Sequence, residues 1–119
     1  MGMRSMFSAL VLAALLVPAP ARAEPRDDAR AQVEFGILMA QKGLWKEALY
    51  RWERAVQIDP TYAAAYNNLA VAYEHAGAFG KARQAYERAL ELEPTNVQIE
   101  QNYDLFREIN DRAHSSSTR

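Results

Sequence analysis

The sequence of 119 residues contains no cysteine, only two histidines, and no large excess of either charge. The lack of cysteine excludes disulfides, thiolate metal ligands and cysteine nucleophiles. His75 and His114 lie far apart in the sequence, which leaves little material for metal binding or acid–base catalysis. A formal net charge of −1 provides no basic surface for nucleic acid. We therefore predict no catalytic residue, no metal, no cofactor and no nucleic-acid partner.

The first 23 residues differ in composition from the rest of the chain. Arg4 precedes an apolar run from Met6 to Val17, and the small residues of Ala21-Arg22-Ala23 follow two prolines. This order is typical of a bacterial secretory signal peptide, with cleavage after Ala23. The alternative is a retained membrane anchor, but a run of this length forms a helix of roughly 18 Å, against a hydrocarbon core of about 30 Å. We expect a periplasmic or secreted protein with no membrane span, whose processed chain has a net charge of −3.

Two stretches of the remaining sequence carry the same pattern at an offset of 34 residues. Residues 52–61, WERAVQIDPT, align with residues 86–95, YERALELEPT, and the same offset pairs Gly43 with Gly77. Apolar residues recur at helical spacing between these glycine and proline breaks. A period of this length indicates stacked helix pairs that bury their apolar faces against one another. The predicted helices cover residues 29–41, 45–58, 63–75, 79–92 and 97–112.

The breaks divide the chain into six predicted segments. Asp27 or Asp28 is the expected cap of the first helix, and Thr95 begins a capping box before the last helix. The serine-rich C-terminus has nothing to bury and is expected to be disordered. The segments are a signal peptide (1–23), a short linker (24–28), a first repeat unit (29–62), a second repeat unit (63–96), a capping helix (97–112) and a disordered tail (113–119).

The two units resemble the tetratricopeptide repeat, a 34-residue helix–turn–helix motif. The second unit matches at Tyr66, Leu69, Ala70, Tyr73, Gly77, Ala82, Tyr86, Ala89 and Pro94. The first unit matches at Phe35, Gly36, Gly43, Ala48, Trp52, Ala55 and Pro60. Gln32 and Met39 depart from the pattern, as suits an end repeat with no preceding neighbour. The resemblance implies an all-α fold of antiparallel helix–turn–helix repeats, two units plus a C-terminal capping helix, in a short right-handed superhelix.

Residue size along the repeat predicts where helices meet. Gly36 and Ala70 occupy equivalent positions and are small, as a close helix crossing requires. The next member of this series is Asp104, which indicates that no helix packs there and that the last helix is a lone cap. Large residues such as Phe35 and Trp52 are expected to fill the space between helices. Stacked repeats need about three units for independent stability, so we expect a domain near the lower limit of ordinary stability.

The resemblance also implies a binding surface, because the first helix of each repeat in this family lines a concave groove. Carboxamides in that groove can both donate to and accept from a peptide backbone; the alternative is an ordinary solvated helix face. Some family members hold a terminal carboxylate with a clamp of lysine, arginine and asparagine, but only Asn68 of that clamp is present here, so this ligand is not expected. The predicted groove residues are Arg30, Val33, Glu34, Ile37, Asn67, Asn68, Val71, Gln98, Gln101, Asn102 and Leu105.

Three functions were weighed against these observations. The first is a non-catalytic interaction module of the bacterial envelope that holds a peptide or helix of a partner protein in its groove. The second is a structural module that self-associates through its repeat edges, burying Leu105, Ile109 and the outer face of the first unit. The third, an enzyme, has least support, because the sequence offers no nucleophile–base set, no phosphate-binding loop and no cluster of metal ligands.

Overall fold

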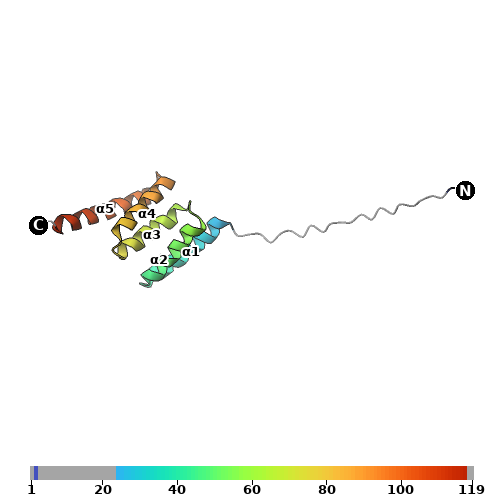
Figure 1. Ribbon diagram of the computed structural model, residues 1–119, viewed down its shortest axis with the longest axis horizontal. Helices are drawn as coiled ribbons and strands as arrows, with labels where there is room; N and C mark the ends of the chain where they lie inside the picture. The colour runs from blue at the N-terminus through green and yellow to red at the C-terminus, as the bar shows by residue number, and fades with distance from the viewer. Residues whose placement is uncertain (1, 3–23, 118–119) are drawn as a thin grey trace.

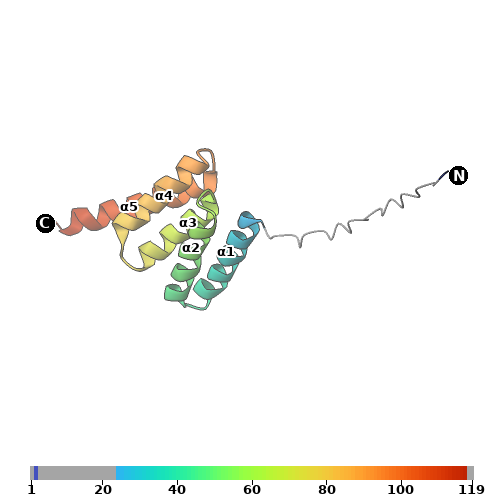
Figure 2. The same ribbon diagram turned by 45° about the vertical axis from the view of Figure 1, so that its right-hand side comes forward.

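The computed structural model describes residue 2 and residues 24–117, and all regular structure in this part of the chain is helical. Consecutive helices run antiparallel and stack side by side, while the C-terminal half of α5 extends beyond the other helices (Figures 1 and 2). The predicted all-α arrangement is therefore confirmed. The predicted signal peptide, apart from Gly2, lies outside the described residues. The helices are α1 (Pro25–Gln41), α2 (Trp45–Ile58), α3 (Ala63–His75), α4 (Phe79–Leu92) and α5 (Val97–Ser117).

The turn inside each repeat unit closes in the same way. Gly43 and Gly77 have φ angles of 76° and 73°, a left-handed conformation that glycine adopts without steric cost. In the first unit the amide of Leu44 donates to the carbonyl of Met39 at 2.9 Å, and the equivalent bond 34 residues later has the same length. This wrapping bond satisfies a carbonyl that the end of the helix would otherwise leave unpaired. The predicted glycine stops are confirmed in both units.

The core is built from small residues that surround two large aromatic ones. Trp52 and Tyr86, at equivalent positions of the two units, are 2% and 1% exposed. Gly36 lies directly against the indole of Trp52, because a Cβ added there would be 2.4 Å from Nε1. The predicted close crossing is thus confirmed in the first unit by the contact of Gly36 with Trp52. In both units the small residue of the crossing, Gly36 or Ala70, is buried. The fully buried alanines are Ala29, Ala48, Ala55, Ala65, Ala70, Ala82 and Ala89.

The start of α1 differs from the prediction. The helix begins at Pro25, so residues 25–28 are its first turn rather than a linker, and neither Asp27 nor Asp28 is the capping residue. Proline suits this position because the first helical amide has no partner within the helix. Glu24 precedes the helix in an extended conformation and makes no side-chain capping bond. Asp27 and Asp28 instead place negative charge in the first turn, where the helix dipole favours it.

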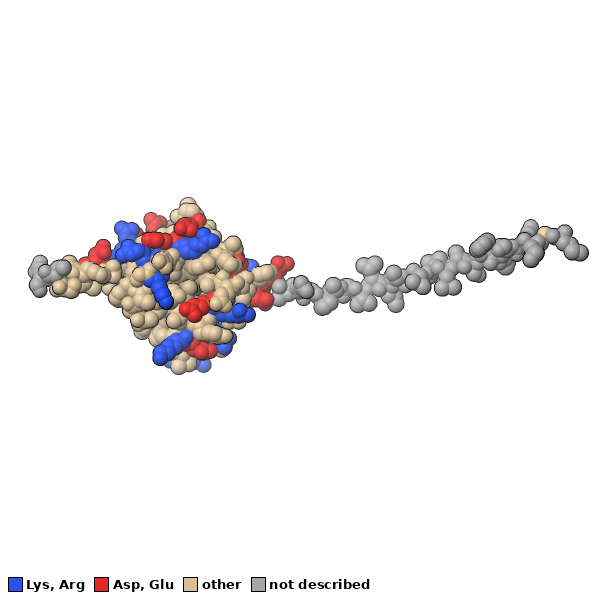
Figure 3. Space-filling view, in the orientation of Figure 1, with Lys and Arg blue, Asp and Glu red and all other residues tan. Residues whose placement is uncertain are grey.

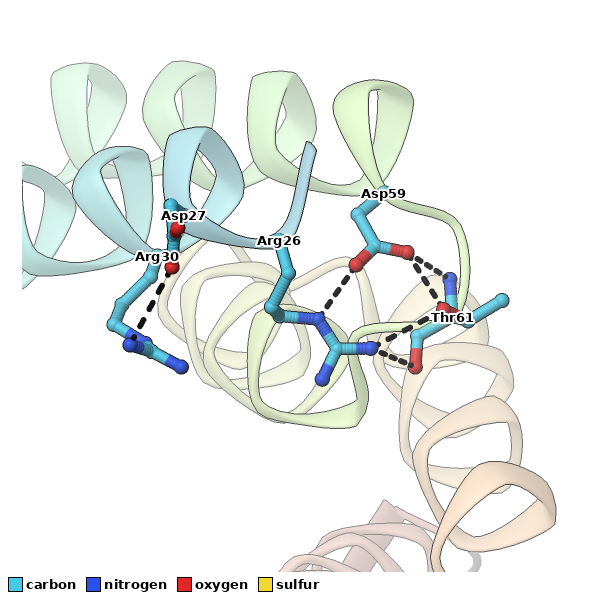
Figure 4. Close-up of polar contacts among 5 residues, drawn as sticks. All are labelled: Arg26, Asp27, Arg30, Asp59 and Thr61. Atoms are coloured by element: carbon cyan, nitrogen blue, oxygen red, sulfur yellow. Dashed lines mark hydrogen bonds and ion pairs between the residues drawn. The ribbon is translucent and has the colours of Figure 1, made fainter. Parts of the chain in front are cut away.

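Polar contacts hold this first turn against the loop between α2 and α3 (Figure 4). Arg26 Nε donates to Asp59 Oδ2 at 2.6 Å, and Arg26 Nη2 donates to the carbonyl of Thr61 at 3.2 Å. The hydroxyl and amide of Thr61 donate to the other carboxylate oxygen at 2.6 and 3.0 Å. The hydrogen bonds from Thr61, followed by that from Arg26, lower the pKa of Asp59 to about 2. These long-range bonds explain why the helix extends to Pro25, a feature that local sequence pattern could not show.

Helix α5 begins at Val97 as predicted, but its capping residue and its C-terminal end differ from the prediction. Its cap is Asn96 rather than Thr95, because the side chain of Asn96 accepts a hydrogen bond from the amide of Ile99 at 3.2 Å. The helix continues to Ser117 rather than ending at Arg112, so residues 113–117 of the predicted disordered tail are helical. Residues 118–119 of that tail lie outside the described part of the chain. Serine hydroxyls in this last stretch bond to carbonyls three residues earlier, which is compatible with a helix.

Phe35 was expected in the core but is 40% exposed. Its side chain lies on a face of α1 across which no helix of residues 24–117 packs, and the guanidinium of Arg51 lies 4.4 Å from its ring centroid. The position fills space between helices only when a helix precedes it, as it does for the equivalent Leu69. Asp104, in contrast, lies on an exposed face of α5. This agrees with the prediction that no helix packs on the last helix at this position.

Candidate partner-binding groove

A shallow hollow lies between α1 and α3, on the face where the groove was predicted. Its volume is about 290 Å³. Ile37, Asn68 and Val71 are the predicted residues that line it. Ile37 and Val71 are equivalent in the two units, so the repeat places an apolar side chain on each wall. The remaining lining residues, which sequence reasoning missed, are Ala40, Gln41, Trp45 and Trp52.

Trp45, one of the residues that line the hollow, also links the two repeat units. Its indole stacks on the imidazole of His75 with 3.8 Å between ring centroids and an interplanar angle of 24°. Trp45 begins α2 and His75 ends α3, so the stack joins the two helices at one end of the hollow. The sequence predicts that both residues lie at helix ends, but nothing in their spacing predicts that they are in contact.

The carboxamides of the groove face bond mainly to the protein itself. Asn68 Nδ2 donates to the carbonyl of Ala64 at 2.8 Å, within α3. Asn102 Nδ2 donates to Asn67 Oδ1 at 3.2 Å, which ties α5 to α3. Each amide still has further hydrogen-bonding capacity, since a carboxamide offers two donor hydrogens and an acceptor oxygen. The structure thus brings Asn67 and Asn102 together, whereas Asn68 lies by itself beside the hollow.

The other predicted groove residues fall into two groups. Val33 is 4% exposed and packs in the core, because it points between α2 and α3; its place among the ligand contacts is therefore corrected. Its carbonyl accepts the indole hydrogen of Trp52 at 3.1 Å. Arg30 is exposed and lies 3.7 Å from Asp27. The remaining members are exposed on α1 and α5 outside the hollow, namely Glu34, Gln98, Gln101 and Leu105.

A buried phenol of α4 lies near a carboxylate of α3. Tyr86 donates its hydroxyl hydrogen to Glu74 Oε1 at 3.0 Å. Burial, reinforced by the nearby Glu74 carboxylate, raises the pKa of Tyr86, and burial also raises the pKa of Glu74. The raised pKa of Tyr86 keeps the phenol protonated at neutral pH. The pair therefore acts as a structural hydrogen bond rather than as an activated base or nucleophile.

Acidic and basic side chains are interspersed over the visible face of the domain (Figure 3). Within residues 24–117 no group of three histidine, aspartate or glutamate side chains is placed to hold a metal ion. In that same part of the chain, no helix has the length and apolar character that a membrane crossing requires. What the surface offers is a shallow apolar hollow flanked by carboxamides.

These features define a class of protein, the helical repeat protein, whose stacked helix pairs present a surface rather than an enclosed pocket. Residues 36–77 match the TPR repeat family, and residues 63–96 match the tetratricopeptide repeat. Together the matches cover residues 36–96, which include both intra-unit turns and all of α2, α3 and α4. The chain therefore belongs to the tetratricopeptide repeat family. Domains of this family generally mediate protein–protein interaction.

Solved structures and one curated protein agree with this assignment. The Arabidopsis OM64 TPR domain superposes with a TM-score of 0.68 at 21% identity, over 75% of this chain and 74% of that one. The crystal structure of MamA gives 0.65 at 26% identity, over 72% of this chain and 50% of that one. Mouse protein O-mannosyl-transferase TMTC4 is 37% identical over 54 residues, which are 45% of this chain but only 7% of that protein. The shared segment is too small a part of TMTC4 to carry its enzymatic activity to this chain.

Proposed function

We propose that the chain is a non-catalytic adaptor of the bacterial envelope that holds an extended peptide segment of a partner protein in the hollow between α1 and α3. The observation that carries this proposal is the composition of the hollow. Ile37 and Val71 supply apolar walls, and Asn68 lies beside them with hydrogen-bonding capacity to spare. An extended peptide presents both side chains and backbone amides, which match these two kinds of contact.

The envelope setting is supported by the N-terminal sequence rather than by the fold. A basic residue, an apolar run and Ala21-Arg22-Ala23 precede the first helix, which begins at Pro25. Cleavage after Ala23 would leave Glu24, the residue before α1, as the new N-terminus. Expression of residues 1–119 in a bacterium, followed by cell fractionation and mass spectrometry, tests this. We expect a periplasmic or secreted chain that begins at Glu24; a cytoplasmic chain that retains residues 1–23 would contradict it.

Peptide binding is tested by selection from a displayed library of unstructured peptides. Selected peptides are titrated into labelled protein, and the backbone amide resonances that shift are mapped. We expect shifts in α1 and α3 around the hollow, and loss of binding with Val71→Arg and with Asn68→Ala. Val97→Asp is the matched control, because Val97 is an exposed apolar residue outside the hollow. Peptides that shift only amide resonances away from the hollow, or that bind Val71→Arg equally well, would refute peptide binding in the hollow.

A further inference from the structure

The outer face of α1, at the N-terminal end of the helix stack, is apolar. Ala31, Phe35 and Leu38 are spaced by four and three residues and therefore share one face of the helix. Phe35 and Leu38 are 40% and 51% exposed. We call these three residues the α1 stripe; no helix of the described residues 24–117 packs across it, although the Arg51 guanidinium of α2 lies 4.4 Å from the Phe35 ring centroid. Exposed large apolar side chains that are contiguous on one face mark interaction sites more often than scattered ones do.

The repeat itself shows what the α1 stripe is shaped to contact. The 34-residue offset places it in register with Ala65, Leu69 and Ala72 on α3. Those three residues are 0%, 6% and 2% exposed, because α2 packs on them. The α1 stripe therefore has the spacing of a face that receives a helix, although Phe35 and Leu38 are larger than their counterparts Leu69 and Ala72. It also differs from its counterpart in having no helix of residues 24–117 packed across it.

The C-terminal end of the stack is closed differently. Asp104 on α5 is equivalent to the fully buried Ala70 on α3, and Arg107 is equivalent to Tyr73. Asp104 and Arg107 lie 3.8 Å apart with well-exposed side chains. Charged residues here make this edge unsuitable for a packed helix. The two ends of the domain are thus unequal. Where the repeat would receive a helix, α5 has the Asp104–Arg107 pair, with the exposed Leu105 and Ile109 beside it, whereas α1 has the apolar stripe.

Opposite charges lie at the two ends of the α1 stripe. Asp28 precedes Ala31 by three residues and Lys42 follows Leu38 by four, so all lie on the same face. Within residues 24–117 neither charged side chain forms an ion pair with another residue. When two copies of α1 lie antiparallel, the acidic end of each meets the basic end of the other. The face is therefore complementary to itself, as an interface with two-fold symmetry requires.

We propose that a second copy of the chain docks on the α1 stripe, with the two α1 helices antiparallel, Leu38 of each copy in the shared apolar contact, and Asp28 of each copy beside Lys42 of the other. This goes beyond peptide binding, because the hollow between α1 and α3 lies on a different side of α1 and stays open in the pair. Dimerisation would place two hollows on one particle, so that two segments of one partner bind with greater combined strength than either alone.

Sedimentation velocity over a concentration series tests the dimer with the chain purified from cells that express residues 1–119, its N-terminus read by mass spectrometry. We expect a reversible dimer. Leu38→Asp should weaken dimerisation by at least about 30-fold, because a symmetric interface loses the leucine contact twice. Leu105→Asp is the matched control, since Leu105 is a similarly exposed leucine on α5. A chain that remains monomeric at the highest soluble concentration overturns the proposal, and so does a dimer lost in Leu105→Asp but kept in Leu38→Asp.

A charge exchange tests the antiparallel arrangement. Asp28→Lys alone and Lys42→Asp alone should each weaken the homodimer, because each brings like charges together at both ends. The double variant should restore it, and the two single variants mixed in equal amounts should form a heterodimer. Failure of both the double variant and the mixture to recover dimerisation would overturn this arrangement. Peptide titration at the hollow, repeated with Leu38→Asp, should be unchanged for a single site, so failure of the dimer and failure of the groove are distinguishable.

Discussion

Replacing Gly36 by alanine should destabilise the domain, although the same change in the middle of an exposed helix is stabilising. An added Cβ would lie 2.4 Å from Nε1 and 2.8 Å from two carbon atoms of the Trp52 indole. The indole is 2% exposed and its N–H donates to the carbonyl of Val33 at 3.1 Å, so it cannot move away from α1 without losing this hydrogen bond. Either α1 has to move away from α2, or the hydrogen bond from the Trp52 indole to Val33 has to break.

The size of the effect follows from three contributions. Overpacking a filled core costs about 1–3 kcal/mol. Loss of a buried hydrogen bond that leaves its groups unpaired costs about 1–3 kcal/mol more. Alanine recovers about 1 kcal/mol of helix propensity relative to glycine. The free energy of unfolding should therefore fall by about 1–5 kcal/mol, a large fraction of what a domain of this size has to lose.

Gly80 provides the matched control. It lies in the first turn of α4, and a Cβ added there would have no atom within 4 Å. Gly80→Ala should be neutral or raise stability by up to about 1 kcal/mol. Urea denaturation followed by far-ultraviolet circular dichroism measures both variants without depending on tryptophan emission. If Gly36→Ala proves as stable as the parent chain, the close contact with Trp52 does not exist in solution and the packing argument is wrong.

Three further predictions concern single interactions. The folded-state pKa of Asp59 is about 2, below its ordinary value of 3.8, so its ionised form stabilises the fold above about pH 4 and this contribution disappears as the pH falls toward 2. Allowing for the solvent around the half-exposed Arg26, it amounts to about 1 kcal/mol, and Asp59→Asn should remove that part of the acid dependence of the melting temperature. Asn96→Ala should cost about 1 kcal/mol in urea denaturation by removing the α5 cap, whereas Asn96→Asp should retain it. Gly43→Ala should lower the melting temperature, because alanine at a φ of 76° costs about 1–2 kcal/mol; an unchanged value would mean that the turn relaxes to a different conformation.

The helix pattern could be predicted because it depends on local chemistry that repeats. Gly43 and Gly77 mark left-handed turns, and the two prolines mark breaks, so the helices of residues 45–58, 63–75 and 79–92 have the predicted bounds. The size series through Gly36 and Ala70 indicated close crossings for the same reason. Every feature of this group depends on the residue type at its own position in the repeat, and not on which side chains of different segments meet.

The features that could not be predicted depend on contacts between distant residues or on an absent neighbour. Arg26 extends α1 to Pro25 by binding Asp59, 33 residues away. Trp45 meets His75 across the two units, and no spacing rule relates them. Phe35 matches the repeat pattern, yet it is exposed because the pattern describes a residue with a helix in front of it. Val33 was placed in the groove by the family pattern, whereas its side chain faces the core.

The Trp45–His75 stack makes the fluorescence of Trp45 a natural reporter of the contact between the two repeat units. The two tryptophans of the sequence occupy different settings, since Trp52 is enclosed within the first unit and Trp45 lies at its junction with the second. Emission from a chain that keeps only Trp45 would follow the parting of neighbouring units, and emission from one that keeps only Trp52 would follow the melting of the first unit. In a linear array of repeats, separation of the units and unfolding of one unit are distinct events. The two emission spectra can therefore distinguish a domain whose units separate first from one that unfolds as a whole.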